Sequence, residues 1–270
     1  ILVMGPLLAR YGEAQVSLPG GCAIGTRPGD LHIRAMQKMG AIVELADGYV
    51  QARAPKGLSG AKIEFPLVSV GATENALMAA CLAKGQTQLV NAAKEPEIID
   101  LAACLVSMGA KIEGAGSDVI TIEGVDSLHN GAHSVVPDRV EAGSYAIAAA
   151  MTGGALTLTN MHSSHLESLF EAMRQAGVSI NTQENTAQIS SDGRYQAVDI
   201  ETQPHPGFPT DLQAQFMAMM CLAEGHSKIS ETIFENRFMH VPELMRMGAD
   251  ITIEGRTALV TGKASLLSAP

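Results

Sequence analysis

Met108-Gly109-Ala110-Lys111-Ile112-Glu113, at residues 108–113, is one of four copies of the pattern that decides the fold. In each copy a glycine follows a stretch of helical apolar periodicity and precedes a short alternating stretch, and these glycines recur every 68 to 71 residues. Because glycine readily adopts the left-handed conformation that stops a helix, each copy predicts a helix followed by a strand. The other copies are Met39–Glu44, Ala176–Asn181 and Met247–Thr252.

A second glycine pattern ends a longer helix in three of the repeats and leads into another alternating stretch. These patterns cover residues 82–85, 151–154 and 222–225. The longer helices carry alanine, methionine and leucine on nearly every side, so we expect them to be buried. We predict an α/β fold built from strand–helix–strand–helix–strand–strand repeats. A period of about 70 residues exceeds that of a solenoid, so the repeats should form a globular protein. They span about 1–62, 63–136, 137–203 and 204–270.

The composition excludes several classes of protein. The chain has 270 residues, 46% of them apolar, which is enough for a sizeable core. A net charge of −10, with only 18 lysines and arginines, argues against a nucleic-acid-binding surface. The sequence has no apolar run long enough to predict a membrane-spanning helix. Its four cysteines show neither zinc-ligand spacing nor a disulfide framework, so we expect a cytoplasmic protein without a metal or another cofactor.

Cys22 lies between glycines in the stretch Leu18–His32, five residues before Arg27. The glycines and prolines of this stretch exclude a regular helix and interrupt any strand ladder. A nearby positive charge lowers the pKa of a thiol, so we predict a loop that carries a reactive cysteine. The alternative is a small buried apolar side chain. We expect that packing role for the cysteines inside apolar helical runs, which are Cys81, Cys104 and Cys221.

Asp211 and Glu97 each have a structural and a functional interpretation. Thr210-Asp211-Leu212-Gln213 matches a capping box, in which an acidic residue complements the helix dipole. A helix N-terminus also keeps a carboxylate ionised, as a base that accepts a hydroxyl proton requires. Glu95-Pro96-Glu97 likewise matches a helix start with proline at the first position.

Arg237 lies between Phe234 and Phe238, which are unusual neighbours for a solvated surface cation. Its guanidinium, like that of Arg27, can bond two oxygens of a phosphate or carboxylate at once. We therefore predict that both arginines bind anionic groups. His32 has two interpretations, as a structural histidine or as one that orients a ligand-binding loop.

Six stretches together resemble the family of UDP-N-acetylglucosamine 1-carboxyvinyltransferases, which are enolpyruvyl transferases. The resemblance runs through the whole chain in order. The stretches are Leu18–Pro28, Ser69–Asn75, Asn91–Ile98, Pro137–Glu141, Pro206–Gln213 and Phe234–His240.

The resemblance implies a two-lobed inside-out α/β barrel of six repeats, with helices central and sheets outward. The four repeats here would be the second to fifth. Residues 1–136 would form the lobe with the Cys22 loop and 137–270 the second lobe. The implied reaction transfers enolpyruvyl from phosphoenolpyruvate to UDP-N-acetylglucosamine with release of phosphate. This is the first committed step of peptidoglycan synthesis, and so serves cell wall biogenesis, cell shape and cell division. The implied enzyme is a monomer.

The resemblance also implies roles for individual residues. Cys22 would be the proton donor and the thiol alkylated by fosfomycin, Asp211 the carboxylate beside the reacting hydroxyl, and Arg237 a catalytic cation. The remaining implied positions bind substrate, with Glu97 in a supporting role. They are Arg27, Pro28, Gly29, Asp30, Leu31, His32, Ser69, Val70, Gly71, Glu97 and Ile233.

The chain departs from the family pattern in ways that bear on activity. Gly29 stands where the family often has valine, and Leu67 where some members have lysine. A Lys-Asn pair, an arginine and an Asp-Leu-Arg segment that hold phosphoenolpyruvate in the family are not in this sequence. We therefore expect the 270-residue chain alone to be weakly active or inactive. The alternatives are a non-catalytic UDP-sugar-binding or structural fragment and a shikimate-type enolpyruvyl transferase.

Overall fold

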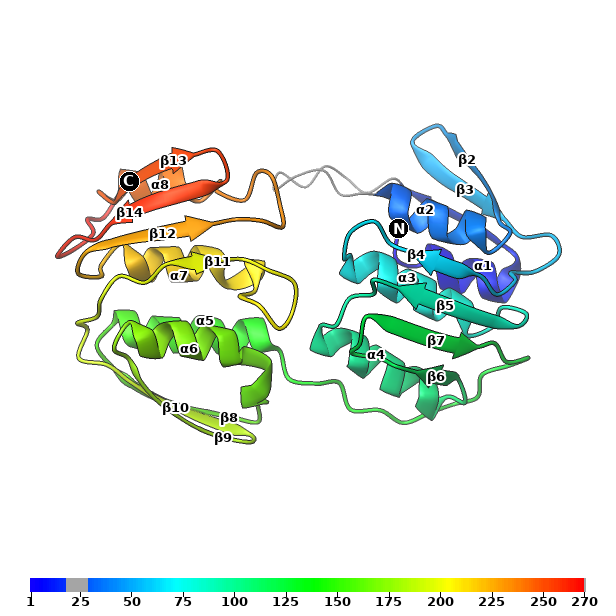
Figure 1. Ribbon diagram of the computed structural model, residues 1–270, viewed down its shortest axis with the longest axis horizontal. Helices are drawn as coiled ribbons and strands as arrows, with labels where there is room; N and C mark the ends of the chain where they lie inside the picture. The colour runs from blue at the N-terminus through cyan, green and yellow to red at the C-terminus, as the bar shows by residue number, and fades with distance from the viewer. Residues whose placement is uncertain (18–28, 270) are drawn as a thin grey trace. The chain divides into compact units, whose positions relative to one another are not determined.

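The computed structural model of the chain describes residues 1–17 and 29–269, shown in Figure 1. The described residues form two compact units, unit one up to residue 136 and unit two from residue 137. Each unit has its own core of buried apolar side chains. The two units are therefore described separately.

Unit one contains four helices and seven strands among its described residues. In chain order they are α1 (Met4–Tyr11), β1 (Glu13–Ser17), α2 (Gly29–Lys38), β2 (Ile42–Ala46), β3 (Tyr49–Arg53), β4 (Lys62–Glu64), α3 (Val70–Ala80), β5 (Gln86–Val90), α4 (Pro96–Ser107), β6 (Lys111–Glu113) and β7 (Val119–Glu123).

Unit two repeats much of this order, with two short 3₁₀ helices added. Its elements are α5 (Arg139–Met151), β8 (Ala155–Thr159), η1 (Ser163–Leu166), α6 (Glu167–Gln175), β9 (Ser179–Gln183), β10 (Thr186–Ser190), β11 (Ile200–Glu201), η2 (Thr210–Leu212), α7 (Gln213–Met220), β12 (His226–Ser230), α8 (Val241–Arg246), β13 (Asp250–Glu254) and β14 (Thr257–Thr261).

The glycine pattern predicted the helix ends correctly. In all four copies the glycine has a positive φ, between 91° and 100°, and a strand follows it at once. The repeat is confirmed by the sheets, because the orders β4-β5-β7-β6 and β11-β12-β14-β13 are equivalent. In both sheets the first strand is parallel to the second and the other pairs are antiparallel.

The predicted opening strand is the part of the repeat that was wrong in the third copy. The sheets β1-β3-β2 and β8-β10-β9 have three strands, all antiparallel. In the third repeat no strand of the described residues precedes α5, and the opening strand of the fourth repeat, β11, lies before its predicted boundary at residue 204. The two opening strands that are present are short and pair in parallel, β4 with β5 and β11 with β12.

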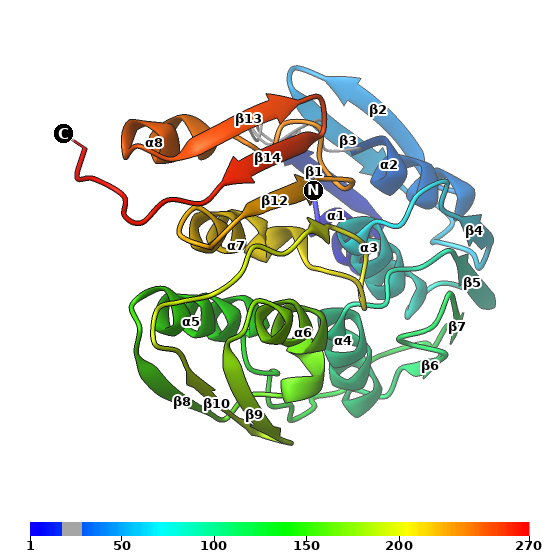
Figure 2. The ribbon, with the colours of Figure 1, turned by 60° about the vertical axis from the view of Figure 1, so that its left-hand side comes forward.

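Within each unit, helices pack against one another and carry sheets on their far sides. In unit two, α5 packs against α7, while α5 contacts β8 and β10 and α7 contacts β12 and β14, as Figure 2 shows. In unit one, α1 packs on α3, with β1 and β3 against α1 and β5 and β7 against α3. The strands bury alternate residues, so each sheet turns its other face to solvent. The predicted burial is confirmed for α3 and α7, whereas α5 remains half-exposed.

Candidate active site

Asp211 and Arg237 form an ion pair in unit two. Asp211 lies in η2, just before α7, and its Oδ1 accepts a hydrogen bond of 2.6 Å from Nη2 of Arg237. The Arg237 guanidinium carbon lies 5.2 Å from the centroid of the Phe234 ring, a cation–π contact. The arginine side chain is largely buried, while the Asp211 carboxylate is half-exposed. Asp211 can therefore meet a ligand, and Arg237 is fixed beside it.

The capping-box interpretation of Thr210–Gln213 is wrong. Pro209 is the N-cap residue of η2 and Leu212 that of α7, and neither cap has a side-chain hydrogen bond. The Thr210 hydroxyl donates instead to Oε2 of Glu231, at 2.9 Å. The Asp211 carboxylate lies in the first turn of η2 and forms an ion pair with Arg237.

Ile233 lies in the segment that leads from β12 toward Arg237. Its backbone N–H donates to Oε1 of Glu231 at 2.9 Å, so the same carboxylate contacts the segments of Asp211 and Ile233. Further along, Nε2 of His240 donates to the sulfur of Met217 at 3.2 Å. Burial, and secondly the charge of Arg237, lower the pKa of His240 and keep it neutral near pH 7. The structure thus brings three sequence-predicted residues, Asp211, Ile233 and Arg237, into one region.

His32 is held in one tautomer in unit one. Gly29, Asp30, Leu31 and His32 open α2, and the His32 side chain is buried. Oδ1 of Asn75 accepts from the Gly5 N–H at 2.7 Å, so the Asn75 NH₂ group is the donor to Nδ1 of His32, at 2.9 Å. Because Nδ1 accepts, the proton of the neutral ring is on Nε2.

The protonation state of His32 follows from its surroundings. Burial is the main cause that lowers its pKa to about 4, the chain's amino terminus adds to it, and Asp30 opposes it. Near pH 7 the imidazole is therefore neutral. It offers a neutral N–H donor at Nε2.

The start of α3 lies against His32. Ser69 is the N-cap residue, and its hydroxyl accepts from the Ala72 N–H at 3.3 Å. A methyl group at Gly71 would lie 3.4 Å from Cε1 and 3.6 Å from Nε2 of His32. Two predicted groups, residues 29–32 and 69–71, therefore meet at one edge of the imidazole.

Glu97 lies in the first turn of α4, where proline at the first position was predicted to start the helix. Burial raises the pKa of Glu74 on α3, and the charges of Glu97 and then Glu95 raise it further. The carboxylates of the α3 and α4 starts are therefore near one another. The supporting role of Glu97 stays a prediction.

Three predicted residues, Cys22, Arg27 and Pro28, lie outside the described residues. Of the other cysteines, Cys81 and Cys221 are fully buried, which confirms their packing role, whereas Cys104 is partly exposed. Burial raises the pKa of Cys81 to about 12 and that of Cys221 to about 11, so neither is a nucleophile at neutral pH.

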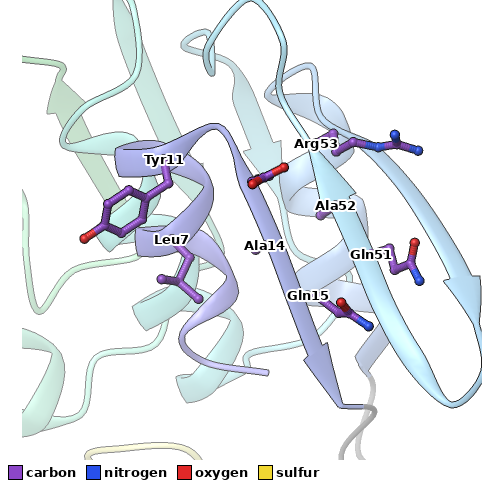
Figure 3. A pocket seen from close by; sticks show the side chains of 8 residues that line it. Leu7, Tyr11, Ala14, Gln15, Gln51, Ala52 and Arg53 are labelled. Carbon is purple, nitrogen blue, oxygen red and sulfur yellow. The ribbon is translucent and has the colours of Figure 1, made fainter.

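Figure 3 shows a surface pocket of unit one that contains none of the predicted residues. It is lined by Leu7 and Tyr11 of α1 and by residues 13–15 and 51–53 of β1 and β3. In the described parts of the chain, no helix is long and apolar enough to cross a membrane. Those parts also hold no cluster of three potential metal-ligating side chains.

Sequence reasoning missed Glu231, Thr210 and Asn75 as members of these sites. Asn75 belongs to a family motif, but its contact with His32, 43 positions away, has no local signature. Thr210 has the local signature of a capping box, which predicted a hydrogen bond to the helix start instead of to Glu231. Glu231 has no sequence signal other than its place at the end of an alternating strand.

Comparisons with known proteins agree on one family. The sequence model of the family described as EPSP synthase (3-phosphoshikimate 1-carboxyvinyltransferase) matches residues 1–270. The UDP-N-acetylglucosamine 1-carboxyvinyltransferase of Gluconacetobacter diazotrophicus is 56% identical over the whole chain, and that of Zymomonas mobilis is 57% identical. The chain spans 64% and 63% of these relatives' lengths.

Solved structures show the same fold. The enolpyruvyl transferase NikO from Streptomyces tendae superposes with a TM-score of 0.80 at 22% identity, over 97% of this chain and 62% of that one. An EPSP synthase from Acinetobacter baumannii gives a TM-score of 0.68 at 18% identity, over 98% of this chain and 63% of the other. The α/β fold is therefore that of the enolpyruvyl transferases.

Proposed function

Because the chain belongs to the EPSP synthase (3-phosphoshikimate 1-carboxyvinyltransferase) family, we propose that it serves enolpyruvyl transfer from phosphoenolpyruvate to the 3′-hydroxyl of UDP-N-acetylglucosamine. The observation that carries the proposal is the identity of 56–58% with enzymes named for that reaction. The Asp211–Arg237 pair supports it, since a half-exposed carboxylate beside a guanidinium suits a hydroxyl and an anion. The product would feed peptidoglycan synthesis in the cytoplasm.

The reaction needs three proton transfers. The hydroxyl oxygen bonds to carbon 2 of phosphoenolpyruvate while the hydroxyl loses a proton and carbon 3 gains one. Carbon 3 then returns a proton to the Cys22 thiolate as the phosphate leaves carbon 2, which restores the double bond. In this proposal Asp211 accepts the hydroxyl proton, and Cys22 delivers the proton to carbon 3. Arg237 exchanges Asp211 for an anionic substrate group, which frees the carboxylate to act as the base.

Unit one would bind the nucleotide part of the substrate. The N-terminus of α3 favours negative charge, and Ser69, Val70 and Gly71 present backbone and hydroxyl donors there. Nε2 of His32 adds a neutral donor beside Gly71. We assign the diphosphate to this region and the uridine to residues 27–31.

The full architecture in this proposal is the two-lobed inside-out barrel of six repeats, active as a monomer. The chain has four repeats and spans 63–64% of its relatives' lengths, which is close to the share that four of six equal repeats would occupy. Units one and two would each contribute to one lobe, at 1–136 and 137–270. In both, sheets cover helices on the outside, as an inside-out barrel requires.

The test compares two acceptors in a completed protein, in which this chain is joined to the flanking segments of the Zymomonas mobilis relative. We expect phosphate release from phosphoenolpyruvate with UDP-N-acetylglucosamine and none with shikimate 3-phosphate. The chain alone should release little phosphate but should bind UDP-N-acetylglucosamine in calorimetry. Release only with shikimate 3-phosphate, or no release with either, would refute the proposal. Normal turnover by the chain alone would refute its expected weak activity.

Cys22→Asp should retain phosphate release in the completed protein while resisting fosfomycin. A carboxylic acid can still donate a proton, but it lacks the sulfur that fosfomycin alkylates. The matched control is Cys104→Ser, which should remain as sensitive as the unaltered protein because Cys104 lies in α4. Full inhibition of Cys22→Asp would show that Cys22 is not the alkylated thiol.

A further inference from the structure

Glu231 is a buried carboxylate that the proposed reaction does not use. It follows β12 directly, and only 1% of its surface is exposed. Its backbone is fixed on both sides by Arg256: the Glu231 N–H donates to the Arg256 carbonyl, and Nε of Arg256 donates to the Glu231 carbonyl, each at 2.8 Å. Burying a carboxylate is costly unless hydrogen bonds compensate it.

Four hydrogen bonds provide this compensation. Oε1 accepts from the Thr202 hydroxyl at 2.9 Å and from the backbone N–H groups of Ile233 and Phe234 at 2.9 and 3.1 Å. Oε2 accepts from the Thr210 hydroxyl at 2.9 Å. An ionised carboxylate is acceptor-only, so it matches these four donors. One side chain thereby joins three segments that are separate in sequence.

Two of those segments carry the ion pair of the candidate site. Thr210 immediately precedes Asp211, and Phe234, whose N–H is bound by Glu231, places its ring against Arg237. On the exposed side, the Asp211–Arg237 hydrogen bond joins the same two segments a second time. The relative position of base and cation thus depends on contacts that converge on one buried carboxylate.

The third segment, at Thr202, connects Glu231 to the sheet. Thr202 follows β11, its N–H donates to the Ser230 carbonyl at 2.9 Å, and its hydroxyl accepts from the Thr232 N–H at 2.9 Å. The Thr232 hydroxyl donates in turn to the Thr202 carbonyl. An apolar side chain could fill the volume of Glu231, but it would leave the Ile233 and Phe234 N–H groups without their acceptor.

We propose that Glu231 is a positioning residue for enolpyruvyl transfer, which sets Asp211 and Arg237 at their working separation through Thr210 and Phe234. The inference rests on the proposed function. Glu231 does not touch the reacting atoms. It acts on Asp211 and Arg237, which do.

The test measures kcat and the Kd of UDP-N-acetylglucosamine in the completed protein. Thr210→Val removes one hydrogen bond without changing side-chain shape, so kcat should fall at least about tenfold while Kd changes less than about threefold. Thr210→Ser keeps the hydroxyl and should restore kcat. The matched control is Thr257→Val: this β14 threonine contacts the Ser230 hydroxyl and neither segment of the ion pair, so kcat should not change.

Glu231 itself is tested by two replacements. In Glu231→Gln the amide oxygen can take the place of Oε1, and the Thr210 hydroxyl can rotate to accept from the amide nitrogen, so kcat should stay within about threefold. Glu231→Met offers no acceptor and should lose at least about tenfold. If Glu231→Met does not fold, the Thr210 variants alone decide.

A double variant separates positioning from general stabilisation. If Thr210 acts through Asp211, Thr210→Val should slow Asp211→Asn no further. Additive losses, or an unchanged kcat in Thr210→Val, would overturn the inference while leaving the proposed function intact. Absence of phosphate release from the unaltered completed protein would instead refute the proposed function, and the inference with it.

Discussion

Asp211→Asn is expected to lower kcat of the completed protein by about 10²–10⁴-fold, the usual contribution of a general base. The amide has nearly the same size and can still accept from Arg237 through its oxygen, so the 2.6 Å contact between η2 and the Arg237 segment can persist. The lost property is the ability to accept the hydroxyl proton. Phosphate release under saturating substrates measures kcat, and calorimetry measures binding of UDP-N-acetylglucosamine, which should change only a few-fold.

The control for this variant is Asp250→Asn, which changes an exposed carboxylate on β13 in the same unit. It should leave kcat unchanged, because β13 carries none of the residues around the ion pair. If Asp211→Asn keeps more than about a tenth of the unaltered kcat, Asp211 is not the base. If it loses substrate binding together with kcat, its role is in binding rather than in proton transfer.

The fold could be predicted wherever the determining interaction is local. A helix followed by glycine stops within a few residues, and all four of these glycines have the expected positive φ. An opening strand is harder to predict, because a strand of three residues, such as β4, depends on its parallel partner, here β5. That pairing joins residues about 26 positions apart, and no local pattern specifies it.

The candidate site shows the same division between local and distant contacts. The family motifs identified Asp211 and Arg237, but not their ion pair, which joins residues 26 positions apart. Thr210 was assigned to a helix cap because the local signature is that of a capping box. Its hydroxyl binds Glu231, 21 positions away. Glu231 accepts hydrogen bonds from three segments that are distant in sequence, and no periodic sequence pattern predicts such contacts.

Gly124 and Gly262 occupy equivalent places in the second and fourth repeats, and alanine at either should be strongly destabilising. Their N–H groups donate to the carbonyls of Gly85 and Gly225 at 3.0 and 3.1 Å. A Cβ atom at either position would lie 1.6 Å from a backbone oxygen, that of Ala83 or Ala223. Backbone cannot yield as a flexible side chain can, so we expect each substitution to cost about 3 kcal/mol of unfolding free energy.

Urea denaturation followed by circular dichroism measures these losses in the chain itself. Gly154→Ala is the control, because Gly154 also lies at one end of a strand, β8, but an added Cβ would meet its nearest neighbours at 3.6 Å. That variant should be neutral or slightly stabilising, since alanine reduces the conformational entropy of the unfolded chain. If Gly124→Ala and Gly262→Ala each cost no more than this control, the glycine backbone does not lie this close to the Ala83 and Ala223 backbone. Equal losses at both positions would instead show that the repeats share the constraint as well as the strand order, because the two glycines lie in different units.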